Sequence, residues 1–555
     1  MKIKTFMAVI ALVAAIILVV SCGPQASQPA TTSPATTSQT TTPTTAKPTA
    51  PTTAVATIAP VPSTTKPKYG GQMRYAFTLE AGSLDPLTLV SGGDETYWRQ
   101  MFDELVDGGK NLTFTSEFSL AESWDVPNAT TMVFHLRKGI KFHDGTDFNA
   151  AAVKFNLDRV LDPKNGSTYL TILTPISSVE VVDTYMVKLN LKNAWGPWLG
   201  AMDSGASAMS SPTAVTNLGK AYSFKPSGTG PFKLVDYVPG SSCLMKKNTD
   251  YWGKDADGNP LPYLDNLTIL VIPDQTVVSA ALETGKVDVA ILPTKDIEKF
   301  QANSNVSVFS GIGGVTSQIT FNIAKPPMDN VNLRKAIAYA VDPDEANQAV
   351  YFGKALISKG DLWPSDSWAY DETVGHPYYD PAKAKEFLKL GGQPNGFTME
   401  AVTYSSPSIL QQAQVYQAQL AKVGIQVNLV VFDVTTATSK FYTQGQYPLF
   451  FNSWSRRPEP DRVASLVYMS NSFYNPAKLS NPAMDALVQR GASLYDIEQR
   501  KAVYHEISVT TIGECWVTPM LYAVTYVAAW KKVGGTDRLL GWDIVARFKR
   551  VWLIQ

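Results

Sequence analysis

The sequence predicts an α/β fold, because segments with a strand-like pattern alternate along it with segments of helical periodicity. The clearest unit is a strand over residues 397–404, a helix over 408–423 and a second strand over 425–430. One face of the predicted helix carries four apolar residues, Ile409, Ala413, Tyr416 and Leu420. A strand–helix–strand unit favours a parallel pair joined by a crossover. Residues 68–555 are too many for one ordinary core, so two or three domains are expected.

The amino-terminal half of this region continues the alternation. Residues 72–78 are predicted to form a strand, and residues 94–107 a helix that Asp94 can cap. Asn149 is suited to cap a second helix with an apolar face. Residues 179–191 are predicted to form a hairpin, because two strand-like runs flank a short polar turn.

The remaining helix starts have clear signals. Asp274 begins a predicted helix that Gly285 ends, and the strand over residues 287–291 follows. Asp380 and Pro381 have the order of a cap followed by proline in the first helical turn. The pattern is therefore that of mixed helices and strands throughout.

The first residues have the composition of an export signal. Two lysines precede an apolar run over residues 6–20, which is shorter than the roughly 20 residues that a membrane-spanning helix needs. Ser21 precedes Cys22, and a small residue before a cysteine resembles the lipobox of bacterial lipoproteins. This resemblance implies that residues 1–21 are a signal peptide and that Cys22 carries a lipid on the extracytoplasmic face of the cell membrane. An uncleaved transmembrane anchor is the alternative.

Residues 22–67 are predicted to be a disordered tether behind the lipidated cysteine. They consist almost entirely of Thr, Pro, Ala, Ser and Gln, and such a segment buries too little apolar surface to offset the entropy of ordering. Proline keeps the segment extended, so it acts as a spacer between the membrane and the folded part.

Composition excludes several classes of function. Lys and Arg together number 48, as do Asp and Glu, and this balance argues against a nucleic-acid partner. Three cysteines cannot form a disulfide framework. Cys243 and Cys515 could pair in an exported protein, but two separate buried thiols are favoured.

Metal binding and catalysis find little support. The chain has four histidines, and none of them forms a metal-binding pair at helical spacing: His135, His143, His376 and His505. His135 and His143 could face each other across a hairpin, although two imidazoles alone make a poor site. We therefore expect no metal and no cofactor.

The sequence has no Gly-x-Ser-x-Gly elbow and no cysteine nucleophile in a recognisable setting. Two carboxylate pairs, Asp342 with Asp344 and Glu459 with Asp461, occur in turn-like contexts that contain proline. The chain is therefore not expected to be an enzyme.

Several strings identify the chain as a member of a known family. Residues 120–124 read LAESW, and residues 134–145 read FHLRKGIKFHDG. Further strings follow in order: GTGPF at 228–232, YW at 251–252, IPD at 272–274, GKVD at 285–288, FN at 321–322, LRKAI at 333–337, YYDP at 378–381 and NPAMD at 481–485. Together they resemble the family 5 extracellular solute-binding proteins, which are peptide, dipeptide and nickel receptors of ABC importers.

The resemblance implies a two-lobed fold of the periplasmic-binding-protein type. Lobe I would comprise residues 68–317, with an extra subdomain over about residues 107–207, and the chain would return to lobe I over residues 518–555. Lobe II would comprise residues 318–517. Two crossover strands between the lobes would form a hinge that lets them close over a solute.

The resemblance also implies the function. A lipid-anchored, monomeric receptor would capture a peptide-like or carboxylate-bearing solute in the cleft and deliver it to the permease and ATPase subunits of an ABC importer. The alternative is a sensor or chaperone-like holder of the solute that signals without import.

One loop departs from the family in a way that bears on the ligand. Asn452 and Trp454 resemble the start of a loop in which dipeptide receptors place an acidic residue that holds the ammonium group of the peptide. Arg456 or Arg457 stands at that position here, ahead of Asp461. Because guanidinium is always charged and binds carboxylates in a bidentate manner, we expect an arginine here to select a carboxylate or another anionic or polyhydroxyl group, with Trp454 as an apolar wall. The alternative is that both arginines face solvent or pair with nearby acids.

Three further residues are candidates for contact with the solute. Trp363 and Trp368 lie in a loop flanked by Gly and Pro, a setting in which binding aromatics occur. Asp85 follows the first predicted strand, where loops of lobe I approach the ligand in related proteins. Packing or turn roles are the alternatives.

Overall fold

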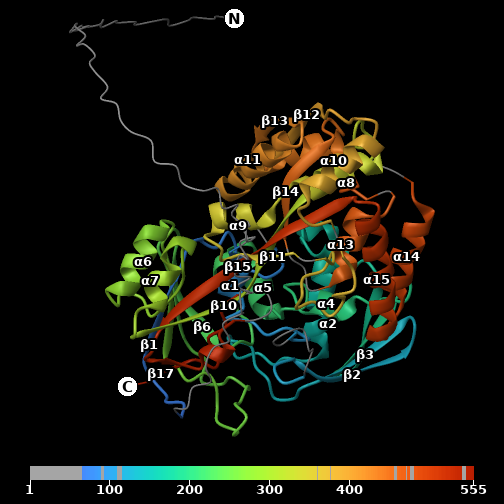
Figure 1. Ribbon diagram of the computed structural model, residues 1–555. Coiled ribbons are helices and arrows are strands. Elements are labelled where there is room, and N and C mark those ends of the chain that lie inside the picture. The colour runs from blue at the N-terminus through green and yellow to red at the C-terminus, as the bar shows by residue number, and fades with distance from the viewer. Residues whose placement is uncertain are drawn as a thin grey trace, which may run out of the picture. The chain divides into compact units, whose positions relative to one another are not determined.

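The structure is a computed structural model that describes residues 66–88, 93–108, 116–358, 360–375, 377–455, 459–470, 472–475, 480–540 and 545–554 (Figure 1). The predicted signal peptide, Cys22 and the tether up to residue 65 lie outside the described residues, as do Arg456, Arg457 and His376. Among the described residues, no helix is long and apolar enough to cross a bilayer.

The largest sheet has eleven strands. Its order is β13 (Ile425–Phe432), β12 (Phe397–Tyr404), β14 (Leu449–Ser455), β10 (Val306–Phe321), β15 (Val517–Trp530), β9 (Val289–Ile291), β1 (Gln72–Phe77), β8 (Asn266–Val271), β7 (Ser242–Lys247) and β6 (Phe232–Val238), with β11 (Leu356–Ile357) beside β15. β12 and β13 are parallel from Phe397↔Ile425 to Tyr404↔Phe432, which confirms the predicted crossover unit. β1 is parallel to both β8 and β9.

The long strands β10 and β15 lie in the middle of this sheet (Figure 1). They connect its two wings, one formed by β13, β12 and β14 and the other by β9, β1, β8, β7 and β6. β10 pairs with β14 through Val315 to Phe321, and β15 pairs with β9 through Val527 to Ala529. The β10–β15 register shifts between Ile312 and Thr316, so the pairing is irregular where one wing gives way to the other. The boundaries predicted for the lobes stay a prediction.

Each wing has its own apolar core on both faces. In the wing that contains β12, Ala401 packs on one side with α8 (Val331–Ala340), α10 (Pro381–Leu390) and α11 (Pro407–Lys422), whereas Val402 packs on the other. In the wing that contains β1, Tyr75 packs into the core on one face of the sheet and Ala76 into the core on the other face. This alternation follows from the two-residue period of a strand that is buried on both faces.

A separate four-stranded sheet has the order β2 (Ala121–Asn128), β3 (Thr131–Leu136), β5 (Met186–Leu191) and β4 (Ile176–Asp183). β4 and β5 form the predicted hairpin. Phe134 and Leu189 share a core with Val153 of α2 (Ala150–Leu161) and Trp198 of α4 (Trp198–Met202). This four-stranded sheet with α2, α3 (Leu170–Leu173) and α4 is called the small-sheet unit below. A further pair joins β16 (Val533–Gly534) and β17 (Trp552–Leu553).

The helices are α1 (Asp94–Trp98), α2 (Ala150–Leu161), α3 (Leu170–Leu173), α4 (Trp198–Met202), α5 (Pro212–Leu218), α6 (Gln275–Glu283), α7 (Ile297–Gln301), α8 (Val331–Ala340), α9 (Pro343–Tyr351), α10 (Pro381–Leu390), α11 (Pro407–Lys422), α12 (Val434–Thr438), α13 (Pro460–Val467), α14 (Pro482–Ser493) and α15 (Ile497–Gly513). Short 3-10 helices are η1 (Pro163–Asn165), η2 (Gly219–Phe224), η3 (Thr294–Asp296) and η5 (Thr536–Arg538), and η4 (Ser439–Thr443) is a short π-helix. The predicted caps Asn149, Asp274 and Asp380 accept hydrogen bonds from the first turns of α2, α6 and α10.

The prediction of a helix over residues 94–107 is wrong beyond Trp98, where α1 ends. The chain leaves the helix because its backbone pairs elsewhere: the Leu105 amide donates to the Ser207 carbonyl at 3.0 Å, and Glu104 forms a β-bridge with Ala208. Backbone pairing with a distant segment thus overrides the helical pattern of the sequence. Met101 and Leu105, which the pattern assigned to the buried face, are nevertheless buried.

Cys243 and Cys515 are both buried and free. Cys243 lies in the core of the β1 wing and Cys515 in that of the β12 wing, so the alternative in which they form a disulfide is wrong. Burial raises the pKa of the Cys243 thiol to about 12 and that of Cys515 to about 11.

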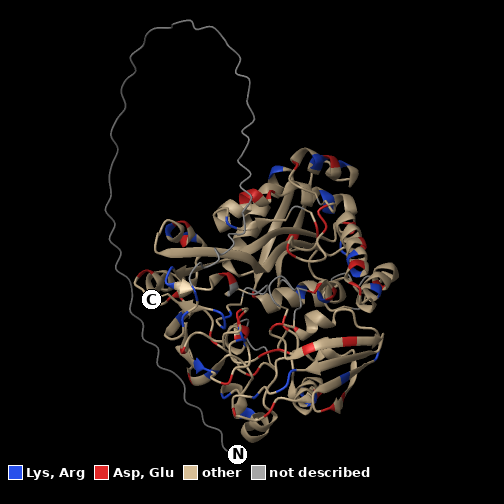
Figure 2. Ribbon diagram, turned by 90° about the horizontal axis from the view of Figure 1, so that it is seen from below, with Lys and Arg blue, Asp and Glu red and all other residues tan. Residues whose placement is uncertain are grey.

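Charged residues of both signs are interspersed along the elements in the view of Figure 2. No block of basic residues stands out on the side shown there, as the equal numbers of basic and acidic residues lead one to expect.

Candidate functional site

A cleft of about 710 Å³ separates the small-sheet unit from helix α13. Thr171, Lys192 and Trp195 line it on the side of the small-sheet unit. Asp461 and Arg462, in the first turn of α13, line the opposite wall. The cleft is therefore bounded by parts of the chain more than 250 residues apart, and it carries ionisable groups of both signs.

The wall formed by α13 is held by a buried ion pair. Glu459 caps α13, its side chain accepting from the Asp461 amide at 3.2 Å. Arg500 of α15, only 3% exposed, donates to both carboxylate oxygens of Glu459, at 2.5 and 3.1 Å. The Arg500 guanidinium also lies 5.0 Å from the ring centre of Trp368. Helix α13 is thus fixed at its first turn by a residue from another helix.

Asp461 lies beside this ion pair and is half-buried in the wall of the cleft. The Tyr504 hydroxyl donates to Asp461 Oδ1 at 3.2 Å and itself accepts from Arg500. Desolvation first and the neighbouring Glu459 carboxylate second raise the pKa of the Asp461 carboxyl to about 7, although the Arg500 guanidinium and the Tyr504 hydroxyl lower it. Asp461 is therefore partly protonated near neutral pH.

Direct contacts join the two walls at one end of the cleft. The Gly196 amide donates to the Ala492 carbonyl at 2.7 Å, and the Trp195 amide donates to the Tyr495 hydroxyl at 3.1 Å. That hydroxyl donates in turn to the Ala129 carbonyl in the small-sheet unit, at 2.9 Å. Arg500 also donates to the Gly196 carbonyl at 3.3 Å. This set of contacts, called the wall bridge below, requires a close backbone approach.

A second cavity of about 320 Å³ opens beside the cleft and shares Arg462, Leu466 and Tyr474 with it. Tyr404, Tyr442 and Trp454 complete its aromatic walls. We call this cavity the side chamber.

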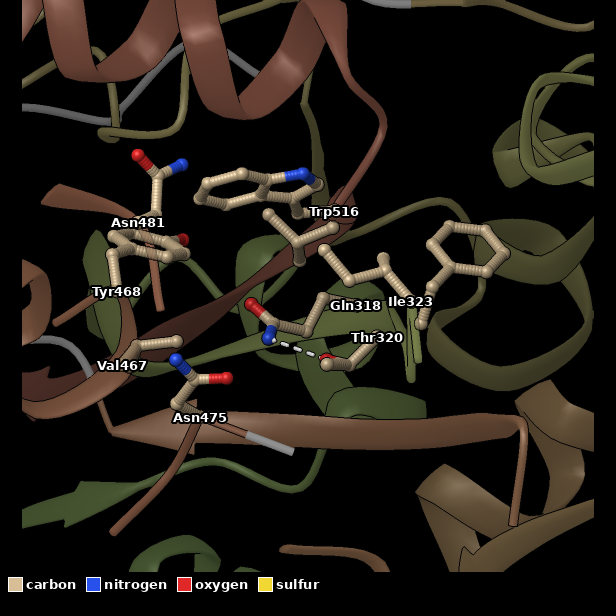
Figure 3. Close-up of a pocket in the computed structure, with 10 residues that line it drawn as sticks. Gln318, Thr320, Ile323, Val467, Tyr468, Asn475, Asn481 and Trp516 are labelled. Atoms are coloured by element: carbon tan, nitrogen blue, oxygen red, sulfur yellow. Dashed lines mark hydrogen bonds between the residues drawn. The ribbon is translucent and has the colours of Figure 1, made fainter. Parts of the chain in front are cut away.

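A third cavity, of only about 40 Å³, lies where β10 and β15 meet the loop after α13 (Figure 3). Gln318 donates to Thr320 Oγ1 at 3.0 Å within it, and Trp516 and Tyr468 lie around this pair. It has room for water but not for a solute.

The structure brings three of the predicted site residues to this region. Asp461 lines the cleft and Trp454 lines the side chamber. Asn452 lies behind the chamber, where its side-chain amide donates to Thr320 Oγ1 at 2.9 Å and to the Tyr442 hydroxyl at 3.3 Å.

The other described candidates lie elsewhere or beneath the surface of the cleft. Trp363 and Trp368 pack edge-on against Tyr504, with ring centres 5.9 and 5.6 Å away. Asp85 is buried, pairs with Arg159, and accepts from the Leu87 amide in its own turn. Neither tryptophan nor Asp85 lines the cleft or the side chamber as described.

Sequence reasoning missed Lys192, Trp195, Arg500 and Tyr474. It also interpreted Glu459 and Asp461 as part of a turn, whereas they are the cap and first turn of α13. The start of α13 could have been predicted from the sequence, since Glu459 followed by Pro460 has the order of a helix cap and a first-turn proline. A helix from that point places Arg462 and Leu466 on one face.

The histidines take separate partners. His135 Nε2 lies 2.9 Å from Asp125 Oδ2, whereas His143 Nε2 lies 3.0 Å from the Gly230 carbonyl. Burial lowers the pKa of His143 to about 4, so it is neutral at physiological pH. In the part of the chain that the structure describes, no group of three or more His, Cys, Asp or Glu side chains could hold a metal ion.

Comparison with known proteins gives a consistent result. The sequence profile of the bacterial extracellular solute-binding proteins, family 5 Middle, matches residues 117–475. The glutathione-binding protein GsiB of Shigella flexneri is 32% identical over 397 residues, which cover 69% of this chain and 76% of that protein. GsiB of Pectobacterium atrosepticum is 30% identical over 437 residues, covering 76% and 83% of the two chains.

Solved structures agree. The periplasmic binding protein DppA from Helicobacter pylori, in complex with the peptide STSA, aligns over 88% of this chain and 99% of its own, with 26% identity and a TM-score of 0.72. CtaP from Listeria monocytogenes aligns with a TM-score of 0.78 at 23% identity and supports the fold alone. The fold is thus the predicted α/β, two-lobed fold of periplasmic binding proteins, and the relatives are binding proteins rather than enzymes. The profile match and the curated relatives together establish that this chain belongs to the bacterial extracellular solute-binding proteins of family 5.

Proposed function

We propose that this chain is the lipid-anchored receptor of an ABC importer and that it captures a peptide-like solute with a free ammonium and a free carboxylate group. The observation that carries the proposal is the cleft, whose lining combines Asp461 with Lys192 and Arg462. A zwitterionic solute could pair its two ends with groups of opposite sign in such a cleft.

The relatives support a solute of this class. The curated relatives are named for glutathione, and the Helicobacter pylori protein was solved with a four-residue peptide. Both ligands combine ammonium and carboxylate groups within a short chain. Arg456 and Arg457 are proposed as additional carboxylate partners, as the sequence suggests.

Isothermal titration with glutathione and a set of tripeptides tests the ligand class. We expect Asp461→Asn to weaken tripeptide binding about tenfold to a hundredfold, because a charged hydrogen bond contributes about 1.5–3 kcal/mol. N-acetylation of the tripeptide should cause a similar loss in the wild type and little further loss in the variant. Lys188→Ala serves as the control, since Lys188 pairs with Glu180 on the small sheet. No heat with any peptide or with glutathione would contradict the proposed ligand class.

The cellular role extends the same proposal. Cys22 would hold the receptor at the membrane through its lipid, residues 22–67 would serve as the spacer, and the loaded form would deliver the solute to the permease. Cys22→Ser should release the protein from the membrane fraction. Stimulation of a cognate transporter's ATPase by loaded receptor supports import, whereas binding to a sensor kinase ectodomain alone supports the signalling alternative.

A further inference from the structure

A buried arginine from another helix holds the end of α15. Arg334 of α8 is 3% exposed, and its guanidinium donates to the Glu514 carbonyl at 2.6 Å and to the Cys515 carbonyl at 3.1 Å. It also donates to the Met328 carbonyl at 2.8 Å. The Glu514 carboxylate lies farther away, at 3.8 Å, and its side chain is 59% exposed. Because the last carbonyls of a helix lack partners within the helix and carry partial negative charge, a fixed cation there anchors the helix end.

The chain turns sharply between α15 and β15. The Cys515 amide donates to the Ile512 carbonyl at 3.0 Å. The Trp516 amide donates to the Thr511 carbonyl at 3.0 Å, and the two bonds together form the Schellman pattern of a helix end. Cys515 has a φ of 52°, in the left-handed region that glycine usually occupies in this motif. A residue with a side chain keeps this conformation only where its surroundings impose it, and the hydrogen bond from Arg334 to its carbonyl is one such contact.

Helix α15 connects this turn with the wall of the cleft. β15 begins at Val517, directly after the turn, and pairs with β10 and with β9 of the β1 wing (Figure 1). Near the other end of α15, Arg500 holds the α13 cap Glu459 and donates to the Gly196 carbonyl in the wall bridge. The helix has 17 residues and is therefore about 25 Å long.

A rigid element of this length amplifies small changes at its end. A tilt of about 5° at the β15 end of α15 would move Arg500 by about 2 Å. Such a shift is enough to break the 3.3 Å hydrogen bond between Arg500 and the Gly196 carbonyl. The angle between α15 and β15 therefore bears on whether the two walls of the cleft can meet.

We propose that Arg334 is a positioning residue for solute capture: it holds α15 at a fixed angle to β15, and through α15 it sets the position of Arg500 and of the α13 wall. Solute binding is one readout of this role, and in that respect the proposal rests on the proposed function. A purely structural role would let Arg334 stabilise the fold without affecting the cleft.

Arg334→Lys separates the two roles, because lysine keeps the positive charge but lacks the planar fork that reaches several carbonyls. We expect it to bind tripeptides about tenfold weaker than the wild type in isothermal titration, as the loss of a charged hydrogen bond implies. Leu420→Ala is the control, since Leu420 is fully buried in α11, in the core of the β12 wing. This variant should lose stability in urea but keep the wild-type affinity. Affinities that fall equally in both variants, or in neither, would overturn the proposal.

A double-mutant cycle tests whether Arg334 acts through Arg500. The two arginines contact opposite ends of α15, so independent effects on affinity would multiply. If α15 transmits the effect, Arg500→Lys already releases the wall, and the double variant should bind no more than about twofold weaker than Arg500→Lys alone. A double variant weakened by the full product of the two single losses would contradict transmission through α15.

Hydrogen exchange, measured without added solute, separates this inference from the proposed ligand class. The Gly196 amide donates to the Ala492 carbonyl in the wall bridge, so its exchange rate reports how long the walls stay in contact. Mass spectrometry of a short peptide around Gly196 should show exchange about tenfold faster in Arg334→Lys and unchanged in Leu420→Ala. If no tripeptide binds the wild type but exchange shows this pattern, the ligand class is wrong and the positioning role stands. If exchange at Gly196 is the same in all three proteins, the positioning role is wrong whatever the peptides do.

Discussion

Asp461 shows how a single residue acquires unusual chemistry from its surroundings. In water its carboxyl group would lose its proton near pH 3.9, whereas in the wall of the cleft its pKa is raised to about 7. The first cause is desolvation, and the second is the Glu459 carboxylate two positions earlier. Near neutral pH the folded protein therefore holds a proton that the unfolded chain has released.

This difference predicts how stability changes with pH. Between about pH 4 and pH 7 the folded state binds more protons at Asp461 than the unfolded state, so stability falls as the pH rises through this window and levels off above it. Asp461→Asn cannot titrate and should lack this part of the slope. Urea unfolding of the wild type and of Asp461→Asn at pH 5 and pH 7.5 measures the change in the free energy of unfolding of each protein.

Asp147→Asn supplies the comparison for that experiment, because the Asp147 side chain is 69% exposed and pairs with Lys141 at the surface. The control should lose as much stability between the two pH values as the wild type. If Asp461→Asn loses the same amount, Asp461 does not carry the raised pKa.

Part of this site could be predicted from the amino-acid sequence alone. Asp461 and Trp454 were predicted because they stand in a recognisable loop, and both line cavities. Arg500 could not be predicted, because its partners Glu459 and Gly196 are far from it in sequence and are met only in the fold. An arginine at a helix start gives no sign in the sequence that it will be buried.

At the level of elements, α13 depends on α15 for its orientation. Glu459 caps α13 and is only 9% exposed, and its charge is compensated by Arg500 near the start of α15. A buried carboxylate that loses its partner is costly, because its charge is then left uncompensated. The ion pair therefore fixes the wall on which Asp461 and Arg462 lie.

Arg500→Ala should lower the free energy of unfolding by about 3–5 kcal/mol, the usual cost of breaking a buried ion pair. Arg490→Ala is the matched control on the neighbouring helix, because Arg490 pairs with Glu506 with both side chains 49% exposed. Such an exposed pair contributes at most about 1 kcal/mol. Urea unfolding of both variants measures the difference, and similar losses would show that the Arg500 pair contributes no more than a surface pair.

Sequence patterns predicted elements well where the signal was local. The β12–α11–β13 unit and the caps at Asn149, Asp274 and Asp380 are in place because side-chain caps, glycine stops and apolar spacing act within a few residues. The helix expected up to Asp107 ends early because Leu105 pairs with Ser207, a contact that no local pattern records.

For the whole molecule, the wall bridge determines how closely the two sides of the cleft meet. A methyl group on Gly196 would lie 1.9 Å from the Leu494 carbonyl oxygen, and one on Gly200 would lie 2.7 Å from Glu459 Cβ. Only glycine allows these approaches. The observed arrangement therefore depends on two residues without side chains.

Gly196→Ala should hold the walls apart, since the added methyl group and the Leu494 carbonyl cannot occupy the same space. We expect a larger radius of gyration in X-ray scattering and solute binding about tenfold weaker, from loss of the Gly196–Ala492 hydrogen bond. Gly513→Ala is the control, because a Cβ at Gly513 meets no atom within 4 Å. An unchanged radius and affinity in Gly196→Ala would show that the bridge does not govern closure.

The position of β15 in the chain has a consequence for biosynthesis. This strand lies between β10 and β9 in the middle of the main sheet, yet it is the last strand of that sheet to leave the ribosome. Until it is made, β9 and β10 each present an open edge, the kind of surface on which chains aggregate. A nascent chain that stops before residue 517 is therefore two incomplete sheets in need of protection rather than a smaller receptor.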